Sequence, residues 1–268
     1  MGWPGLLGLT ILLLWLLAAL AGPSLLSQDG AHMSDAAVFA PMSAEHWLGT
    51  DYLGRDMLAR IIQGARYTVG VALLATLLAS STGTLLALLA ASSAPWLDGA
   101  LSRSIDTLTS IPSKMLALVI VAALGSTLPV LIVMAAIIYV PGAYRIARSL
   151  AININAMDYV VVARTRGEGR LYIMLREILP NIINPMLADL GLRFVFVVLL
   201  LASLSFLGLG VQPPDADWGS LVRENIGALP TGNAAIVAPA LAIASLTIAV
   251  NLLIDNLPGR AAREGGVH

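Results

Sequence analysis

The segment Asp158-Tyr-Val-Val-Val-Ala-Arg-Thr-Arg-Gly-Glu-Gly-Arg-Leu-Tyr-Ile-Met-Leu-Arg-Glu-Ile-Leu-Pro-Asn181 separates two long apolar stretches of the sequence. Asp158 is a suitable helix N-cap, and Gly167 together with Gly169 is expected to end a first short helix. A second, amphipathic helix would stop at Pro180. Its apolar face would consist of Leu171, Met174, Leu175, Ile178 and Leu179. Such a helix pair at a membrane surface either rests on lipid, docks into a partner's groove, or only anchors the topology through its arginines.

The composition is that of a chain that lies in lipid. Apolar residues make up 58% of the sequence, charged residues make up 12%, and the mean hydropathy is +0.85. A soluble domain has about 25% charged residues, because a surface that faces water needs charge. The net charge of −1 does not indicate nucleic-acid binding. The sequence has no cysteine, and His32, His46 and His268 are too scattered for a metal site, so we expect no metal bound by this chain.

Six apolar stretches are long enough to cross a membrane, since a bilayer core of ~30 Å needs about 20 apolar residues in a helix. They cover approximately residues 3–21, 67–91, 100–124, 127–143, 185–207 and 234–254. The sequence therefore predicts an all-α integral membrane protein with a single domain over residues 1–268. Residues 22–66 would form an outer segment, and residues 144–184 would form a cytoplasmic loop.

The first apolar stretch has a second interpretation. Ala19-Leu20-Ala21 resembles the cleavage site of a signal peptide. However, no basic residue precedes the apolar run, as one normally does in a signal peptide. We favour a retained transmembrane helix.

The distribution of basic residues predicts the orientation, because Arg and Lys stay preferentially in the cytoplasm. With a cytoplasmic N-terminus, four arginines lie in the outer regions: Arg55, Arg60, Arg66 and Arg223. Nine lie in the inner regions: Arg103, Arg145, Arg148, Arg164, Arg166, Arg170, Arg176, Arg260 and Arg263. This excess predicts that both termini are cytoplasmic.

Charges within the predicted spans are candidates for function, because a charge at the bilayer centre costs roughly 2.5–3.5 kcal/mol on insertion scales. Lys114 follows Pro112, which should kink the third span. Lys114 would line a translocation path, reach to the membrane surface, or pair with a partner subunit. Asp189 and Arg193 are four residues apart, as an ion pair within one helix would be, and we favour this structural pair over a place in the path.

The outer regions contain turns and a charge cluster. Arg55, between Asp51 and Asp56, predicts a local ion-pair cluster, and Gly49 and Gly54 permit tight turns. After the fifth span, a second set of residues would turn the chain sharply and anchor it at the membrane interface. This set comprises Gly208, Gly210, Pro213, Pro214 and Trp218.

The segment 158–181 resembles the cytoplasmic loop of the permease subunits of binding-protein-dependent ABC importers. That loop carries Glu-Ala-Ala, a glycine four residues after the last alanine, and a downstream Ile-Leu-Pro-Asn. Here Gly167 follows Ala163 by four and residues 178–181 match, whereas Val161 stands in place of the glutamate. The resemblance implies coupling helices that fit a cleft on an ATPase subunit, with shape and apolar contact replacing the missing charge. The implied coupling residues are Asp158, Ala163, Gly167, Leu171, Leu175, Ile178, Leu179, Pro180 and Asn181.

Two further stretches resemble the dipeptide, oligopeptide and nickel permeases of this family, specifically the second permease of each pair. One runs from His46 to Asp56, and the other runs from Leu204 to Pro214 and is followed by Trp218-Gly219. The resemblance implies a type I importer fold with six transmembrane helices. It also implies an outer mouth that either receives a substrate-binding protein or is only shaped by these residues. They are Gly49, Asp51, Gly54, Arg55, Asp56, Gly208, Gly210, Pro213 and Trp218.

The implied function is alternating-access import of dipeptides, oligopeptides or nickel chelates across the bacterial inner membrane. The sequence lacks a Gly-x-x-x-x-Gly-Lys-Ser/Thr phosphate loop, so we expect a non-catalytic chain whose partner ATPases use the ATP and Mg²⁺. The implied partners are a homologous permease in a heterodimer, two ATP-binding subunits and a periplasmic binding protein, together with membrane lipid. By the same resemblance, the fifth span, with Asp189 and Arg193, borders the central path.

The alternatives are a permease for another small solute, a secondary transporter or channel, and an intramembrane enzyme. A secondary transporter would be expected to show more spans or an inverted repeat. An intramembrane enzyme would need clustered polar groups at membrane depth. Neither pattern is visible in the sequence.

Overall fold

The computed structural model describes residues 2–25, 37–231 and 234–256. Its regular structure within these ranges is helical, which confirms the predicted fold class. His32, Arg260, Arg263 and His268 lie outside the described residues. The helices are α1 Trp3–Leu25, α2 Met57–Ala91, α3 Pro95–Thr109, α4 Ser113–Leu124, α5 Leu128–Asn155, α6 Asp158–Thr165, α7 Arg170–Tyr172, the π-helix η2 Ile173–Ile178, α8 Leu179–Phe206, α9 Trp218–Glu224, the 3-10 helix η3 Ile226–Thr231 and α10 Ala234–Asp255.

Among the described residues, five helical segments are long and apolar enough to cross a membrane, and α3 with α4 makes a sixth if the bent pair is one span. The third span is therefore a broken helix, whereas the sequence predicted a kinked one. α3 and α4 meet at an angle of 81°. Pro112 has no N–H to donate and takes an extended conformation as the N-cap residue of α4, so the helix cannot continue through it.

The fourth and fifth predicted spans are shorter than the helices that the structure contains. α5 continues past Pro141 to Asn155, so the prediction that residues 144–155 belong to a loop is wrong. α8 begins at Leu179, before the predicted start near Pro185. The predicted limits followed hydropathy, but a polar residue such as Arg148 remains helical because an acidic side chain of α3 pairs with it.

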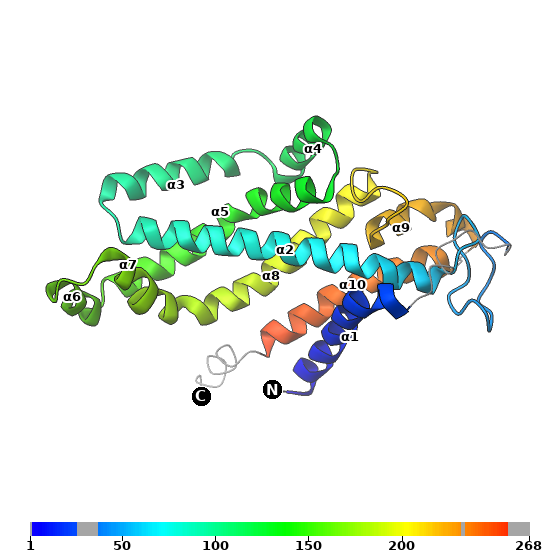
Figure 1. The fold of residues 1–268 in the computed structure, drawn as a ribbon, viewed down its shortest axis with the longest axis horizontal. Coiled ribbons are helices and arrows are strands. Elements are labelled where there is room, and N and C mark those ends of the chain that lie inside the picture. The colour runs from blue at the N-terminus through cyan, green and yellow to red at the C-terminus, as the bar shows by residue number, and fades with distance from the viewer. Residues whose placement is uncertain (1, 26–36, 232–233, 257–268) are drawn as a thin grey trace.

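α2 and α5 form the central pair of the bundle (Figure 1). They approach closely at Gly83, where a Cβ atom would lie 2.6 Å from the Cβ of Ala143 and 2.9 Å from the backbone nitrogen of Tyr144. Small residues at such crossings are the usual means of close packing between membrane helices. α8 packs against both of these helices, and α1 packs against α2 and α10.

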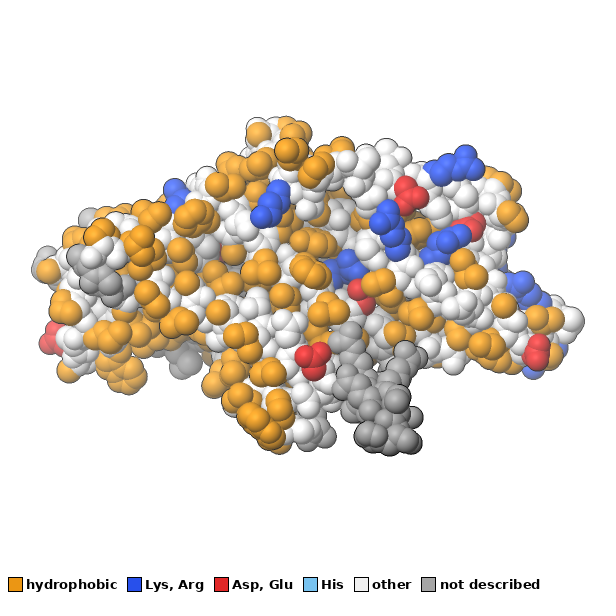
Figure 2. Space-filling model, turned by 180° about the vertical axis from the view of Figure 1, so that it is seen from behind, with side chains coloured by type: hydrophobic (Ala, Val, Ile, Leu, Met, Phe, Trp, Pro, Cys, Tyr) orange, Lys and Arg blue, Asp and Glu red, His pale blue; other side chains and the backbone are white. Residues whose placement is uncertain are grey.

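The two ends of the bundle carry different elements. α6, α7 and η2 lie at one end, and α9 with residues 37–56 lies at the other (Figure 1). α2, with 35 residues, is about 52 Å long and extends beyond a hydrocarbon core of ~30 Å. The face in Figure 2 is mostly apolar, and most of its visible Lys and Arg side chains lie in the half that carries α6. This asymmetry agrees with the distribution of arginines in the sequence.

Candidate functional site at the two ends of the bundle

α6 ends in a Schellman turn at Gly167. The N–H of Gly167 donates to the carbonyl of Arg164 at 2.9 Å, and the N–H of Glu168 donates to the carbonyl of Ala163 at 3.2 Å. Gly167 has a φ of +86°, which is favourable for glycine alone among common residues. No described atom lies within 4 Å of the position that its Cβ would occupy. The predicted helix break is confirmed, and its cause is backbone conformation rather than crowding.

The apolar side chains of this tip are divided between the inside and the surface. Ala163 and Ile178 are fully buried against the rest of the chain, so they hold the tip in place. Leu171 and Leu175 are exposed, and so are three side chains of α6: Val161, and Tyr159 and Val162, which the sequence analysis did not single out. We call the exposed set, Tyr159, Val161, Val162, Leu171 and Leu175, the α6–α7 surface. Val161, which replaces the glutamate of related loops, is 50% exposed.

Two local predictions about this segment are wrong. The N-cap residue of α6 is Met157, and Asp158 is the first helical residue, where its charge still favours the helix N-terminus. Pro180 does not stop the second helix, because it lies in the first turn of α8. Residues Arg170–Phe206 form one continuous helical segment.

A π-helical turn explains why Pro180 is tolerated. The N–H of Leu179 donates to the carbonyl of Met174, five residues earlier, which is the bonding pattern of a π-helix. The ladder is therefore already shifted where proline, which lacks an N–H, enters the helix. The amide nitrogen of Asn181 donates to the carbonyl of Glu177 at 2.7 Å and supplies a side-chain bond near the irregular turn.

At the opposite end, Asp51 is the centre of a buried ion-pair cluster. Its Oδ2 accepts a hydrogen bond from Nε of Arg55 at 2.7 Å. Arg60 and Glu224, which the sequence did not single out, complete the cluster, with Nη2 of Arg60 lying 3.5 Å from Oε2 of Glu224. Burial raises the pKa of the Glu224 carboxyl, and the positive charges of Arg60 and Arg55 oppose that rise. The cluster joins the start of α2 to the end of α9.

Asp56 does not belong to this cluster, contrary to the prediction. Its Oδ1 accepts the N–H of Ala59 at 2.8 Å and caps α2, while its Oδ2 lies 2.9 Å from Nδ1 of His46. The predicted turns at Gly49 and Gly54 are present, with φ values of +73° and +74°.

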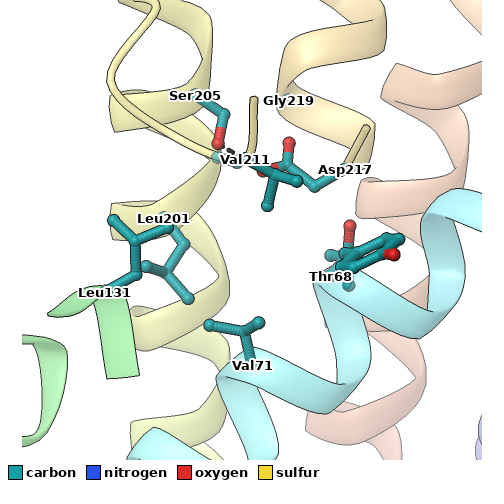
Figure 3. A pocket seen from close by; sticks show the side chains of 10 residues that line it. Thr68, Val71, Leu131, Leu201, Ser205, Val211, Asp217 and Gly219 are labelled. Carbon is teal, nitrogen blue, oxygen red and sulfur yellow. Dashed lines mark hydrogen bonds between the residues drawn. The ribbon is translucent and has the colours of Figure 1, made fainter. Parts of the chain in front are cut away.

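Asp217 fastens α9 to the end of α8. Its carboxylate accepts a hydrogen bond from the Ser205 hydroxyl (Figure 3). It also accepts the N–H of Ser220 at 2.8 Å, and the N–H of Asp217 donates to the Ser220 hydroxyl at 3.0 Å, which completes a capping box. Burial raises the pKa of the Asp217 carboxyl, and hydrogen bonds from Ser205 and the backbone oppose that rise. Gly210 and Gly219 permit the close approach, because a Cβ at either position would lie within 3 Å of Ser205.

The two outer stretches of the sequence meet around α9. The N–H of Tyr52 donates to Oδ1 of Asn225 at 3.0 Å, and Nη1 of Arg60 donates to the carbonyl of Pro214 at 3.2 Å. Gly208 turns the chain with a φ of +85°, and the Pro213–Pro214 peptide bond is cis.

The prediction that Trp218 is an interfacial anchor is wrong, because its side chain is fully buried. Its indole N–H donates to the carbonyl of Ile61 at 2.8 Å. Its ring meets that of Trp15 edge to face, with the centroids 4.5 Å apart. Trp218 therefore packs α9 against α1 and α2.

Within the spans, Asp189 and Arg193 form the predicted ion pair, with Oδ2 and Nη2 2.6 Å apart. Both side chains are buried, and Nη1 of Arg193 also donates to the carbonyl of Tyr139 in α5 at 2.9 Å. The pair therefore connects α8 to α5 inside this chain. Lys114 is exposed in the first turn of α4 and has no part in this pair, which joins α8 to α5.

Two further ion pairs, which the sequence did not predict, connect α3 to α5. Nε of Arg148 donates to Asp98 at 2.6 Å in a two-bonded pair, and Nη2 of Arg145 donates to Asp106 at 2.7 Å. Ile105 is the one buried residue of α3, so apolar packing contributes little to holding α3 in place. Its ion pairs with α5 are therefore a main contribution to the attachment of α3 to the bundle.

We expect Arg148→Gln to destabilise the folded protein by about 1 kcal/mol, because a partly buried pair joined by two hydrogen bonds is lost. Arg145→Gln is the matched control, since that pair is more than half exposed and is expected to contribute about 0.5 kcal/mol or less. Thermal melting of both purified variants measures the difference. Equal melting temperatures for the two variants would contradict this ranking.

The structure is thus a bundle of membrane-spanning helices with an exposed apolar surface at the α6 end and a buried ion-pair cluster at the α9 end. Residues 83–263 match the family described as the binding-protein-dependent transport system inner membrane component. The chain belongs to this family, and it is an inner-membrane component of a transport system.

Three relatives show how widely the likeness extends. The dipeptide transport system permease DppC of Alkalihalophilus pseudofirmus is 33% identical over 94% of this chain and 83% of its own length. The di/tripeptide transport system permease DppC of Pseudomonas aeruginosa is 34% identical over 93% and 84%. The glutathione transport system permease GsiD of Pectobacterium atrosepticum is 34% identical over 80% and 71%.

A solved structure supports the fold. The crystal structure of an amino acid ABC transporter with histidines superimposes with a TM-score of 0.50 at 20% identity. The superposition covers 79% of this chain and 94% of the chain in the solved structure. The likeness confirms the type I importer fold that the sequence implied.

Proposed function

We propose that this chain is the permease subunit of an ATP-driven importer of peptides, and that its α6–α7 surface docks on an ATPase subunit. The exposed surface carries the proposal, because five large apolar side chains lie on a tip whose own buried residues fix its shape. Apolar side chains exposed together in this way are typical of a protein-interaction site. The relatives whose names specify dipeptides, di/tripeptides and glutathione support a peptide substrate.

The two ends of the bundle differ in a way that fits the other subunits of the proposed importer. The α6 end would face the cytoplasm with both termini, and two separate ATPase subunits would bind and hydrolyse ATP with Mg²⁺ there. The α9 end would face the periplasm and receive the substrate-binding protein. A homologous permease would complete the translocation path, to which Lys114 would contribute an exposed cation, while the buried Asp189–Arg193 pair would support the wall formed by α5 and α8.

Gly167→Val in the complete transporter is the sharpest test of docking. A β-branched residue in the left-handed conformation costs about 1–2 kcal/mol, so the Schellman turn should open and α6 should lose its position. We expect ATP-dependent uptake of a dipeptide into proteoliposomes to fall at least tenfold while ATP hydrolysis continues. Gly169→Val, two positions further along the same turn, is the control, because Gly169 has a φ of −73°, which valine adopts readily, and its Cβ would meet no described atom within 4 Å.

Two results would count against the proposal. Unchanged uptake in Gly167→Val would argue against docking through this turn. Uptake by the wild-type protein without ATP or without the ATPase subunits would argue against an ATP-driven importer altogether.

A further inference from the structure

An open groove runs between α1 and α2 near the end of the bundle that carries α9. It has a volume of about 510 Å³, and its walls include Leu16, Leu20 and Leu73. Gly70 lies along it with no described atom within 4 Å of the position that its Cβ would take. The groove is thus largely apolar and open to the outside of the bundle, and no described part of the chain fills it.

Arg66 lies at the same groove, one turn of α2 before Gly70, together with the hydroxyl-bearing Ser24 of α1. The Arg66 side chain is exposed, and it makes no ion pair or hydrogen bond within residues 2–25, 37–231 and 234–256. By contrast, Arg60 of the same helix and Arg193 of α8 both have carboxylate partners in the chain. Among the described residues, Arg66 therefore provides a positive charge without a carboxylate partner beside an apolar groove.

The depth of Arg66 places this charge near the boundary of the hydrocarbon core. The apolar run of α1 ends at Gly22, and a Cβ at Gly22 would lie 2.5 Å from Cγ2 of Ile62, one turn of α2 before Arg66. The α1–α2 contact is thus close to where the apolar run ends. A long arginine side chain can reach from such a position to the level of the lipid headgroups.

We propose that this groove binds an anionic phospholipid, with an acyl chain along Gly70 and the phosphate group beside the guanidinium of Arg66. The ligand class follows from charge complementarity and shape together. The groove offers apolar length for an acyl chain, and its one guanidinium offers a partner for the phosphate. The inference depends on the membrane location of the chain and not on its transport substrate.

The complete transporter, purified in a mild detergent and incubated with phosphatidylglycerol or phosphatidylcholine, tests the site by native mass spectrometry. We expect the wild-type complex to retain phosphatidylglycerol in preference to phosphatidylcholine. Arg66→Gln should lower retained phosphatidylglycerol about fivefold and leave phosphatidylcholine unchanged, since one basic residue near a membrane surface contributes that much. Gly70→Leu should reduce the retention of both lipids, because its side chain would occupy the groove.

Arg103→Gln is the matched control, since Arg103 is an exposed arginine of α3 that does not border this groove, and lipid retention should not change. Equal retention of phosphatidylglycerol by Arg66→Gln and the wild type would overturn the proposal. Photo-leucine in place of Leu73, which lines the groove and keeps nearly the size of leucine, shows whether lipid or protein occupies the groove. Crosslinks to lipid support the site, whereas crosslinks to a helix of the partner permease would show that protein fills the groove and would refute it.

Discussion

Replacing Gly83 with alanine is expected to separate α2 from α5 and to destabilise the folded protein by about 3 kcal/mol. The added Cβ would lie 2.6 Å from the Cβ of Ala143 and 2.9 Å from the carbonyl oxygen of Val140. Carbon atoms in contact prefer a separation of about 3.5–4.0 Å, so the two helices must move apart by roughly 1 Å. Two of the three nearest atoms belong to the backbone of α5, so no rotation of a side chain relieves the clash.

Gly70→Ala is the control for this experiment, because it adds the same methyl group to the same helix where no described atom lies within 4 Å. It should be neutral or stabilise the helix by up to about 1 kcal/mol through the better helix propensity of alanine. Thermal melting in detergent and the yield of protein in the membrane measure both effects. A wild-type melting temperature for Gly83→Ala would show that α2 and α5 leave room for a methyl group at this crossing.

The second large effect is expected for Asp217→Ala, which should release α9 from the end of α8 at a cost of about 3 kcal/mol. The variant loses a helix cap and leaves the Ser205 hydroxyl and the N–H of Ser220 buried without an acceptor. Asp217→Asn should lose less than half as much, because its amide has the same shape and still offers one acceptor oxygen. Ser205 would then accept a hydrogen bond instead of donating one.

The stability of these variants and the protease sensitivity of residues 207–217 are the measurements. We expect faster cleavage of this stretch in Asp217→Ala than in Asp217→Asn or the wild type. Similar cleavage of all three would mean that Asp217 does not fasten α9.

The membrane class and most spans could be predicted because they depend on composition and on the length of apolar runs. The break at Gly167 was also predictable, since glycine is the one common residue that readily adopts the required left-handed conformation. Pro180 was misjudged because the rule that proline stops a helix assumes a regular α-helical ladder. The π-helical turn before it, which depends on packing against other elements, changes that ladder.

The unpredicted features are those that join residues far apart in the sequence. Arg148 and Asp98 are 50 positions apart, and no local pattern indicates that α3 and α5 bring them together. Trp218 was placed at the interface because tryptophan is often found there, but the structure puts its ring against Trp15, far away in the sequence. At the α9 end, local spacing suggested Asp56 as a partner of Arg55, while the folded chain provides Glu224.

One helical segment, Arg170–Phe206, begins beside the α6–α7 surface and ends at the bond between Ser205 and Asp217. Under the proposed function, an ATPase would contact one end of this segment and a substrate-binding protein the other. If the ATPase favours one position of the segment, it changes the affinity of the binding protein, and thermodynamic linkage requires the reverse effect to be equally large. Binding of the substrate-binding protein at the periplasmic end would thus change the nucleotide affinity of the ATPase at the cytoplasmic end, and the ATPase would change the affinity of the binding protein by the same factor.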